Sequence, residues 1–234
     1  GHKLAELLHK LCAISGIHWI RLHYLYPDEI TEDMIAAIES EEKILPYLDI
    51  PIQHCNDTVL EKMNRRGDKA YLTELFAKLR ARIPGLVLRT SIIAGLPYED
   101  EAAFEEMCAF LREQKFERAG VFAYSPEEGT RAAEMDCRAD EDEAARRVEL
   151  LVDIQSRVMD EWNESWLGDT VEVLCEGFDG QAQMYVGRSY ADSPDVDGHV
   201  YFTAEQEIAE GTFVPVRITG SMDGDMTGEA VEEI

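Results

Sequence analysis

Apolar residues in the first 135 positions alternate between short continuous runs and longer runs at helical spacing. The short runs predict buried strands at residues 17–26, 45–52, 86–94 and 119–124. The runs at helical spacing predict helices over residues 3–12, 32–40, 71–83 and 99–114, and a further helix that ends at residue 63. Strands alternating with helices in this way form parallel β/α units. We therefore predict four consecutive units, with polar residues where their strands end.

The pattern changes after residue 136. One long amphipathic helix is predicted over residues 140–166, and Gly168 ends it. The following apolar segments are short, separated by Asp, Gly and Pro turns, and lie at residues 171–176, 184–186, 199–202, 213–219 and 227–231. This spacing predicts a five-stranded OB-like β-barrel. The expected fold class is α/β followed by all-β, with domains at residues 1–167 and 168–234.

The run from Arg89 to Asp100 is the first candidate for a functional site. It begins as an apolar strand and ends in Gly, Pro and acidic residues, which is typical of a strand that turns into a helix. Gly95 permits a positive φ and close approach of a ligand to the backbone. Ligands of open α/β sheets bind beyond the carboxyl ends of the strands. An ordinary strand-to-helix connection is the alternative interpretation.

Composition indicates a globular protein. The chain has 234 residues, of which 45% are hydrophobic, so it can bury a sizeable core. It contains no apolar run of membrane-spanning length and no signal-peptide pattern, so a cytoplasmic location is expected. The chain begins with Gly1 rather than Met, which indicates a fragment or a processed protein.

The cysteines argue against a disulfide framework and a local metal site. They are five in number and far apart in the sequence, at Cys12, Cys55, Cys108, Cys137 and Cys175. We expect most of them to be core thiols.

Charge is the strongest signal in the composition. The 22 Lys and Arg residues face 48 Asp and Glu residues, a formal net charge of −26. From Gly168 onward, fifteen acids are opposed only by Arg188 and Arg217, so this quarter of the chain has a net charge of −13. Such a field repels phosphate backbones and attracts basic partners. Simple solubility is the alternative explanation.

Four separated motifs together resemble the radical-SAM methylthiotransferase family. They are Asp-Ile-Pro-Ile-Gln-His at residues 49–54, Met-Asn-Arg at 63–65, the run at 89–100, and the Asp-rich run at 185–198. The last run most resembles the RimO type, whose members modify a ribosomal protein. The resemblance extends from Leu4 to Val231.

The resemblance implies a fold and a reaction. It implies a partial TIM-like barrel, represented here by strands three to six, followed by a small β-barrel called a TRAM domain. The implied cofactors are S-adenosylmethionine and [4Fe-4S] clusters, and the implied reaction replaces C–H by C–SCH3 through a 5′-deoxyadenosyl radical. In the RimO type the acceptor is the β-carbon of an aspartate in the twelfth small-subunit ribosomal protein.

One element of the family is missing from the sequence. No CxxxCxxC motif occurs in this chain, although three such thiolates would leave one iron open to the cofactor. The family places this motif earlier, together with two barrel strands. We therefore expect this stretch alone to be inactive, and we expect segment 17–26 to be an exposed apolar edge strand.

The resemblance also implies which residues bind the cofactor. They lie at the ends of the implied fourth, fifth and sixth strands, namely Gln53 and His54, then Arg89, Thr90, Ser91 and Gly95, then Phe122, Tyr124 and Ser125. Each has an ordinary structural alternative.

Gln53 and His54 can instead cap the next helix, Arg89 can pair with Glu99 or Asp100, and Tyr124 can be a core residue with a hydrated hydroxyl. The residue pattern does not name a catalytic acid or base.

The substrate is inferred from charge. A basic ribosomal protein complements the acidic barrel, with Asp192, Asp195 and Asp197 as the expected docking residues, and no direct binding of nucleic acid or membrane is expected. The full-length protein is expected to be a monomer. One alternative is the MiaB type, which modifies an adenosine of transfer RNA, and another is an acidic docking module without catalysis.

Overall fold

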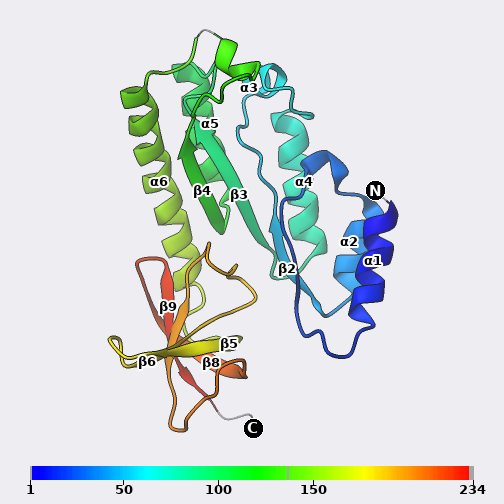
Figure 1. Cartoon of the computed structure of the whole chain (residues 1–234), viewed down its shortest axis with the longest axis vertical. Coiled ribbons are helices and arrows are strands. Elements are labelled where there is room, and N and C mark those ends of the chain that lie inside the picture. Colours follow the sequence, from blue (N-terminus) through cyan, green and yellow to red (C-terminus); the bar gives the residue numbers. More distant parts are fainter. Residues whose placement is uncertain (1, 136, 232–234) are drawn as a thin grey trace. The chain divides into compact units, whose positions relative to one another are not determined.

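The computed structural model describes residues 2–135 and 137–231. Contacts divide the chain into two compact units, residues 1–155 and residues 156–234. The first unit contains a parallel sheet with helices, and the second contains a closed β-barrel (Figure 1). The division falls within one long helix, α6 (Glu141–Glu164).

The sheet of the first unit has the strand order β1-β2-β3-β4, and every neighbouring pair is parallel. Its strands are β1 (Ile20–Leu22), β2 (Ile44–Asp49), β3 (Val87–Ala94) and β4 (Arg118–Ala123). Sequence order equals spatial order, as in an open part of a β/α barrel. The predicted run of parallel β/α units is confirmed.

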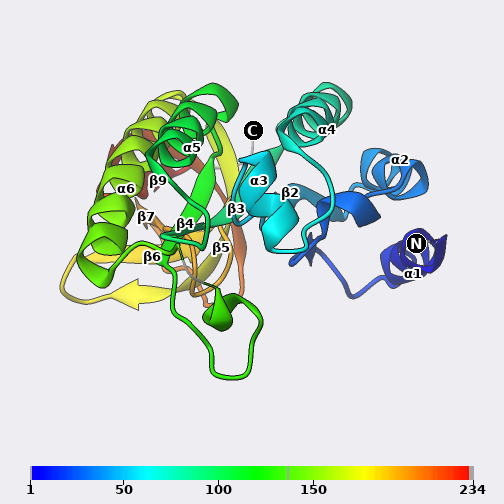
Figure 2. The ribbon, with the colours of Figure 1, turned by 90° about the horizontal axis from the view of Figure 1, so that it is seen from above.

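Helices follow the curve of the sheet along one side (Figure 2). They are α1 (His2–Cys12), α2 (Glu32–Ser40), α4 (Lys69–Arg82), α5 (Glu101–Gln114) and the first turns of α6, whereas α3 (Asp57–Lys62) follows the end of β2. Two short 3₁₀ helices lie at Pro27–Glu29 and Ala132–Glu134. Buried side chains of all five long helices join those of the strands in one core.

The helix starts follow from short polar side chains. Thr31, Asn56, Asp68 and Asp100 each accept a hydrogen bond from a backbone N–H in the first turn of α2, α3, α4 and α5 respectively. These bonds satisfy N–H groups that the helix itself leaves without partners. None of the helices in the described residues combines the length and apolar character needed to cross a membrane.

The two faces of β3 differ in polarity. Side chains at positions 88, 90, 92 and 94 are buried, whereas those of Arg89, Ser91 and Ile93 are half-buried on the opposite face. Successive side chains of a strand point to opposite faces. The helices therefore cover one face, and a polar face remains on the other side of the sheet.

Strand β1 occupies the edge of the sheet, as predicted, but it is shorter than predicted. Only Ile20–Leu22 forms a strand, and its pairing with β2 shifts register between Ile20 and Leu22. Beyond it, Tyr24 takes a positive φ of 56°, and its N–H bonds to the side-chain carboxylate of Asp49, the last residue of β2. A three-residue edge offers few unpaired backbone groups to another chain.

The second unit is a five-stranded closed barrel, which confirms the predicted OB-like architecture. Its strands run in the order β5-β6-β7-β9-β8, namely β5 (Thr170–Asp179), β6 (Met184–Arg188), β7 (Val200–Thr203), β9 (Asp225–Ala230) and β8 (Phe213–Met222). The interior is filled by apolar side chains, and Trp162 and Trp166 at the end of α6 pack against them. Tyr185 stacks on the buried ring of Phe202, with centroids 5.5 Å apart.

Gly187 is required for the contact of β6 with β5. A Cβ atom at this position would lie 2.3 Å from the carbonyl oxygen of Leu174. We expect Gly187→Ala to lower the free energy of unfolding of the barrel by about 1–3 kcal/mol, because a backbone atom must move. Urea unfolding followed by tryptophan fluorescence measures this. Gly180→Ala is the matched control, since nothing lies within 4 Å of its added methyl group, and equal losses in both variants would contradict the prediction.

The cysteines differ in exposure. Cys12, Cys55, Cys108 and Cys175 are buried free thiols and Cys137 is exposed. Burial raises the pKa of the Cys55 thiol to about 12, so this group stays protonated and unreactive at about pH 8.

We expect a thiol reagent to modify one site rapidly in the native chain and Cys137→Ser to remove that site. Fast modification of a second thiol under native conditions would contradict this assignment.

Candidate functional site

A cavity lies at the carboxyl ends of the four parallel strands. It has a volume of about 630 Å³. Its walls come from all four strand ends and from the segment after α3, and they consist of Tyr24, Gln53, Met63, Arg65, Arg89, Ser91, Ile93, Leu96, Phe122, Ala123, Tyr124 and Ser125. The lining combines apolar and polar side chains, as in sites that take an amphipathic small molecule.

Six of the nine predicted cofactor-binding residues line this cavity. They are Gln53, Arg89, Ser91, Phe122, Tyr124 and Ser125. The parallel pairing explains why they meet, because β3 aligns Ser91 with Gly120 and Ile93 with Phe122 on β4. Residues from segments far apart in the sequence thus reach the same edge of the sheet.

Gln53 reaches the cavity through an unusual backbone conformation. Its φ is +68°. Its N–H donates to the carbonyl of Ser91 and its carbonyl accepts from the N–H of Ile93, both at 2.9 Å. These two bonds form an isolated parallel bridge beyond the end of β2. A non-glycine residue at positive φ is uncommon and is often found at functional sites.

Arg89 is paired within the sheet, but not with the predicted acids. Its Nη1 lies 2.9 Å from Oδ1 of Asp49, the residue aligned with it on β2. The Asp49 side chain is 1% exposed, and its other oxygen lies 3.6 Å from Nδ1 of His23. The suggested pairing of Arg89 with Glu99 or Asp100 is wrong, because those acids lie beyond the strand end and point elsewhere. The Arg89–Asp49 pair makes the floor of the cavity nearly neutral.

Three predicted residues do not line the cavity. Thr90 is buried on the helix-covered face, where its hydroxyl donates to the carbonyl of Ile50 at 2.9 Å and accepts from the N–H of Ile52 at 3.3 Å. It therefore ties β3 to the segment after β2. The structure thus gives Thr90 a structural role in place of the expected cofactor contact.

Gly95 and His54 are also absent from the cavity lining. Gly95 has a φ of +81°, and a Cβ atom there would lie 2.7 Å from Cβ of Ala144 on α6. His54 is 1% exposed, and its Nδ1 accepts a hydrogen bond of 2.9 Å from the N–H of Asn56. Asn56, rather than His54, caps α3. Both residues therefore lie behind the cavity wall.

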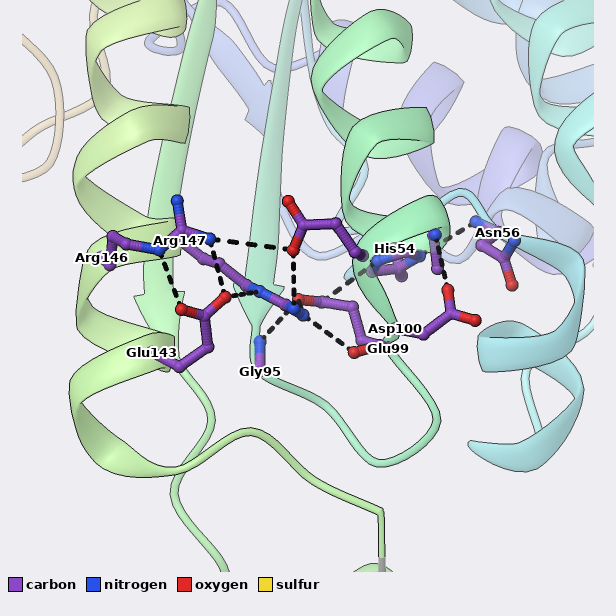
Figure 3. Close-up of polar contacts among 10 residues, drawn as sticks. His54, Asn56, Gly95, Glu99, Asp100, Glu143, Arg146 and Arg147 are labelled. Carbon is purple, nitrogen blue, oxygen red and sulfur yellow. Dashed lines mark hydrogen bonds and ion pairs between the residues drawn. The ribbon is translucent and has the colours of Figure 1, made fainter.

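Behind the wall lies a buried polar cluster, the Glu99 cluster, formed by His54, Gly95, Glu99 and Arg147 (Figure 3). Oε1 of Glu99 accepts from Gly95 N–H at 3.0 Å and from Arg147 Nη1 at 2.7 Å. Its Oε2 lies 3.2 Å from Nε2 of His54. Glu143 also accepts from Arg147 Nε, at 2.7 Å. One carboxylate thus connects the end of β3, the segment after β2, and α6.

The charge of the Glu99 cluster is balanced. The Glu99 and Arg147 side chains are 1% and 6% exposed. Desolvation opposes charge on Arg147, but the hydrogen bonds that Arg147 donates to Glu99 and Glu143 outweigh it, so the pKa of Arg147 is raised. Removing Arg147 would leave the buried carboxylate of Glu99 uncompensated, which is strongly destabilising, whereas without the charge of Glu99 the guanidinium of Arg147 would still pair with Glu143.

Arg65 is a cavity residue that the sequence-based site prediction missed. Its Nη1 donates to the carbonyl of Pro51 at 3.3 Å, and no carboxylate in the described parts of the chain forms an ion pair with it. Burial lowers the pKa of its guanidinium. A half-buried cation in a polar cavity favours an anionic ligand. The sequence feature that could have identified Arg65 was its place in the Met-Asn-Arg motif after α3.

Tyr124 lines the cavity, but its hydroxyl is buried. Its ring packs beside a small apolar cluster that contains Val59 and Leu96. Its buried hydroxyl has no hydrogen-bond partner among the described residues. A buried hydroxyl without a partner is costly.

The three aspartates predicted for docking have different environments. Asp192 is 1% exposed and its carboxylate accepts from the N–H and hydroxyl of Ser189. Asp197 accepts from the N–H of Ser193 at 2.8 Å. Both therefore shape the loop before β7, because a short acidic side chain satisfies turn N–H groups. Of the three, only Asp195 is exposed.

The described residues offer no ligand set for an iron–sulfur cluster. Within residues 2–135 and 137–231, no three His, Cys, Asp or Glu side chains converge as a metal site would require. The sequence likewise contains no CxxxCxxC motif.

Two family models match the chain. The model of the radical SAM superfamily matches residues 1–111, and that of the TRAM domain matches residues 167–231. Among solved structures, the radical SAM enzyme coproporphyrinogen III oxidase (HemN) from Escherichia coli has a TM-score of 0.52 at 18% identity, over 67% of this chain and 36% of that one. This likeness supports the fold.

Curated relatives match nearly the whole chain. The ribosomal protein uS12 methylthiotransferase RimO of Pelotomaculum thermopropionicum is 45% identical over 229 residues, which is 97% of this chain and 52% of that protein. The protein of the same name from Lachnoclostridium phytofermentans is 43% identical over 227 residues, again 97% and 52%. The chain therefore spans about half the length of the curated relatives it matches. It belongs to the radical SAM methylthiotransferases of the RimO type.

Proposed function

We propose that this chain is part of an enzyme that transfers a methylthio group to the β-carbon of an aspartate in ribosomal protein uS12, in the cytoplasm. The observation that carries the proposal is the cavity at the strand ends, which has an amphipathic lining and belongs to a chain 45% identical to a RimO protein. Residue 168 is proposed as the first residue of its TRAM domain.

The lining of the cavity suits S-adenosylmethionine, which has an aromatic base, a ribose and a charged amino-acid end. Phe122 and Ile93 offer apolar surface to the base. Gln53 and Ser91 offer hydrogen bonds to the ribose hydroxyls, and Arg65 offers a cation to the carboxylate. When bound, this cofactor supplies a methyl group and an adenosyl radical. The neutral Arg89–Asp49 pair keeps the floor rigid without adding net charge.

The residues of this chain would orient the cofactor and shield it from solvent. Tyr124 forms part of the cavity wall, where its ring can pack against the cofactor. A shaped site of this kind would hold the cofactor and the substrate close together and keep other C–H groups of the protein out of reach. No cluster is assigned to the described residues, and no step is derived through one.

The acidic barrel favours a basic protein over transfer RNA as the substrate. With fifteen acids and two arginines after residue 167, this domain would repel a phosphate backbone. Asp195, Glu205 and Glu207 are exposed on its loops and can meet basic side chains. Long-range attraction of this kind raises the association rate and weakens as salt rises.

Arg65 provides the sharpest test of the cofactor site. In the full-length protein, we expect Arg65→Gln to weaken binding of S-adenosylhomocysteine by about tenfold or more, because a hydrogen bond to a charged group contributes about 1.5–3 kcal/mol. Isothermal titration calorimetry measures the dissociation constant. The matched control is Arg66→Gln, since the Arg66 side chain is 84% exposed and pairs with Asp28. Equal effects of the two substitutions would refute the assignment.

Charge reversal tests the docking surface. We expect Asp195→Lys combined with Glu205→Lys to reduce the association rate with uS12, with the largest effect at low ionic strength. Surface plasmon resonance at several salt concentrations gives this rate. Glu74→Lys with Glu113→Lys changes net charge equally on exposed positions of the first unit and serves as the control. Tighter binding of transfer RNA than of uS12 by the wild-type protein would favour the MiaB-type function instead.

A further inference from the structure

The side chain of Gln53 enters the cavity from a backbone that is unfavourable for any residue with a Cβ. Its φ of +68° lies in the left-handed region. The bridge to Ser91 and Ile93 fixes its N–H and its carbonyl. The bridge does not fix the chain after Gln53, where it continues to His54 and α3. A second anchor is therefore needed to hold this conformation.

His54 provides that anchor. Its ring is buried, and Nδ1 accepts the N–H of Asn56 at 2.9 Å, so this nitrogen carries no proton. The proton of the neutral ring is therefore on Nε2, which lies 3.2 Å from Oε2 of Glu99 without the alignment of a full hydrogen bond. The ring is therefore held by one hydrogen bond at Nδ1 and by a close polar contact with the Glu99 carboxylate at Nε2, which together fix the residue directly after Gln53.

Glu99 is itself held from two sides. Arg147 donates through Nη1 to both the carboxylate and the carbonyl of Glu99, at 2.7 and 2.8 Å. Gly95 N–H donates to the same carboxylate oxygen. The carboxylate cannot turn toward another partner without breaking these bonds. Figure 3 shows the resulting line of contacts from α6 through Glu99 to His54.

We propose that His54, Glu99 and Arg147 are positioning residues that hold Gln53 in its cofactor-binding conformation. None of the three lines the cavity, so each acts through Gln53 rather than on the ligand. This inference rests on the proposed function, because it takes the ligand of Gln53 to be the adenosyl cofactor. In chemical terms, the buried ion pair of Glu99 and Arg147 holds the strained backbone of Gln53, whose side chain is proposed to bind the ribose.

A double-mutant cycle in the full-length protein tests the proposal. The variants are Gln53→Ala, His54→Ala and their combination, and the readouts are the dissociation constant of S-adenosylhomocysteine and the thermal unfolding midpoint. We expect His54→Ala to weaken binding by about tenfold when Gln53 is present and by less than about twofold when it is Ala, because the lost effect passes through the Gln53 side chain. A lower unfolding midpoint is expected in both backgrounds.

Two further variants guard against misfolding. Glu99→Gln keeps the shape of the side chain and an acceptor for Gly95, and is expected to show the same background dependence if His54→Ala does not fold. His9→Ala removes a histidine that contacts Glu41 on the surface and is expected to leave binding unchanged.

The outcomes separate the two hypotheses. Wild-type protein that binds no S-adenosylhomocysteine would refute the proposed function. Wild-type protein that binds it, together with an equal loss from His54→Ala in both Gln53 backgrounds, would refute the positioning role alone. No loss of affinity in any folded His54 or Glu99 variant would refute that role as well.

Discussion

The carboxylate of Glu99 is the constraint on which the geometry of the site depends. It is buried, it is neutralised by Arg147 and it accepts the N–H of Gly95. Through it, a helix late in the first unit is tied to the ends of two strands. Because a buried charge without its partner is so unfavourable, this arrangement leaves the strand ends few alternatives. The positions of the cavity walls are therefore determined by buried residues that do not line the cavity.

The open face of the sheet carries a different balance of forces. Arg89 lines its floor and is neutralised by the buried Asp49 on the adjacent strand. Arg65 also lines the cavity and has no carboxylate partner in the described residues. The cavity thus combines a neutral floor with a single cationic group on its wall. Such a site selects ligands whose negative charge lies at one position. A uniformly basic pocket would instead bind many different anions.

The fold was predictable because it depends on patterns that sequence displays directly. The alternation of strands and helices, and the change after residue 136, identified both architectures. The edge strand was predicted too long, since its apolar residues do not reveal that Tyr24 would leave the ladder for the Asp49 carboxylate. Cys137 and the four buried thiols also followed the expectation that most cysteines lie in the core.

The site was predictable only in part. The sequence shows where a strand lies more clearly than it shows which side chains point to which face of the sheet. Gln53 and Ser91 were identified as residues at strand ends, and both line the cavity. Thr90 was included with them, although the two-residue period of β3 turns it to the opposite face. Arg147 could not be found from local sequence, since its partner Glu99 lies 48 positions away. Asp192 looked like part of an acidic surface, but a short turn buries it against Ser189.

The strand order of the barrel has a consequence for its synthesis. Strand β9 lies between β7 and β8, parallel to the first and antiparallel to the second, and it is the last strand in the chain. On a translating ribosome the other four strands emerge before the one that closes the ring. Until residue 230 leaves the exit tunnel, β7 and β8 both present unpaired edges, so the first unit can fold during translation while the barrel must wait for its last strand.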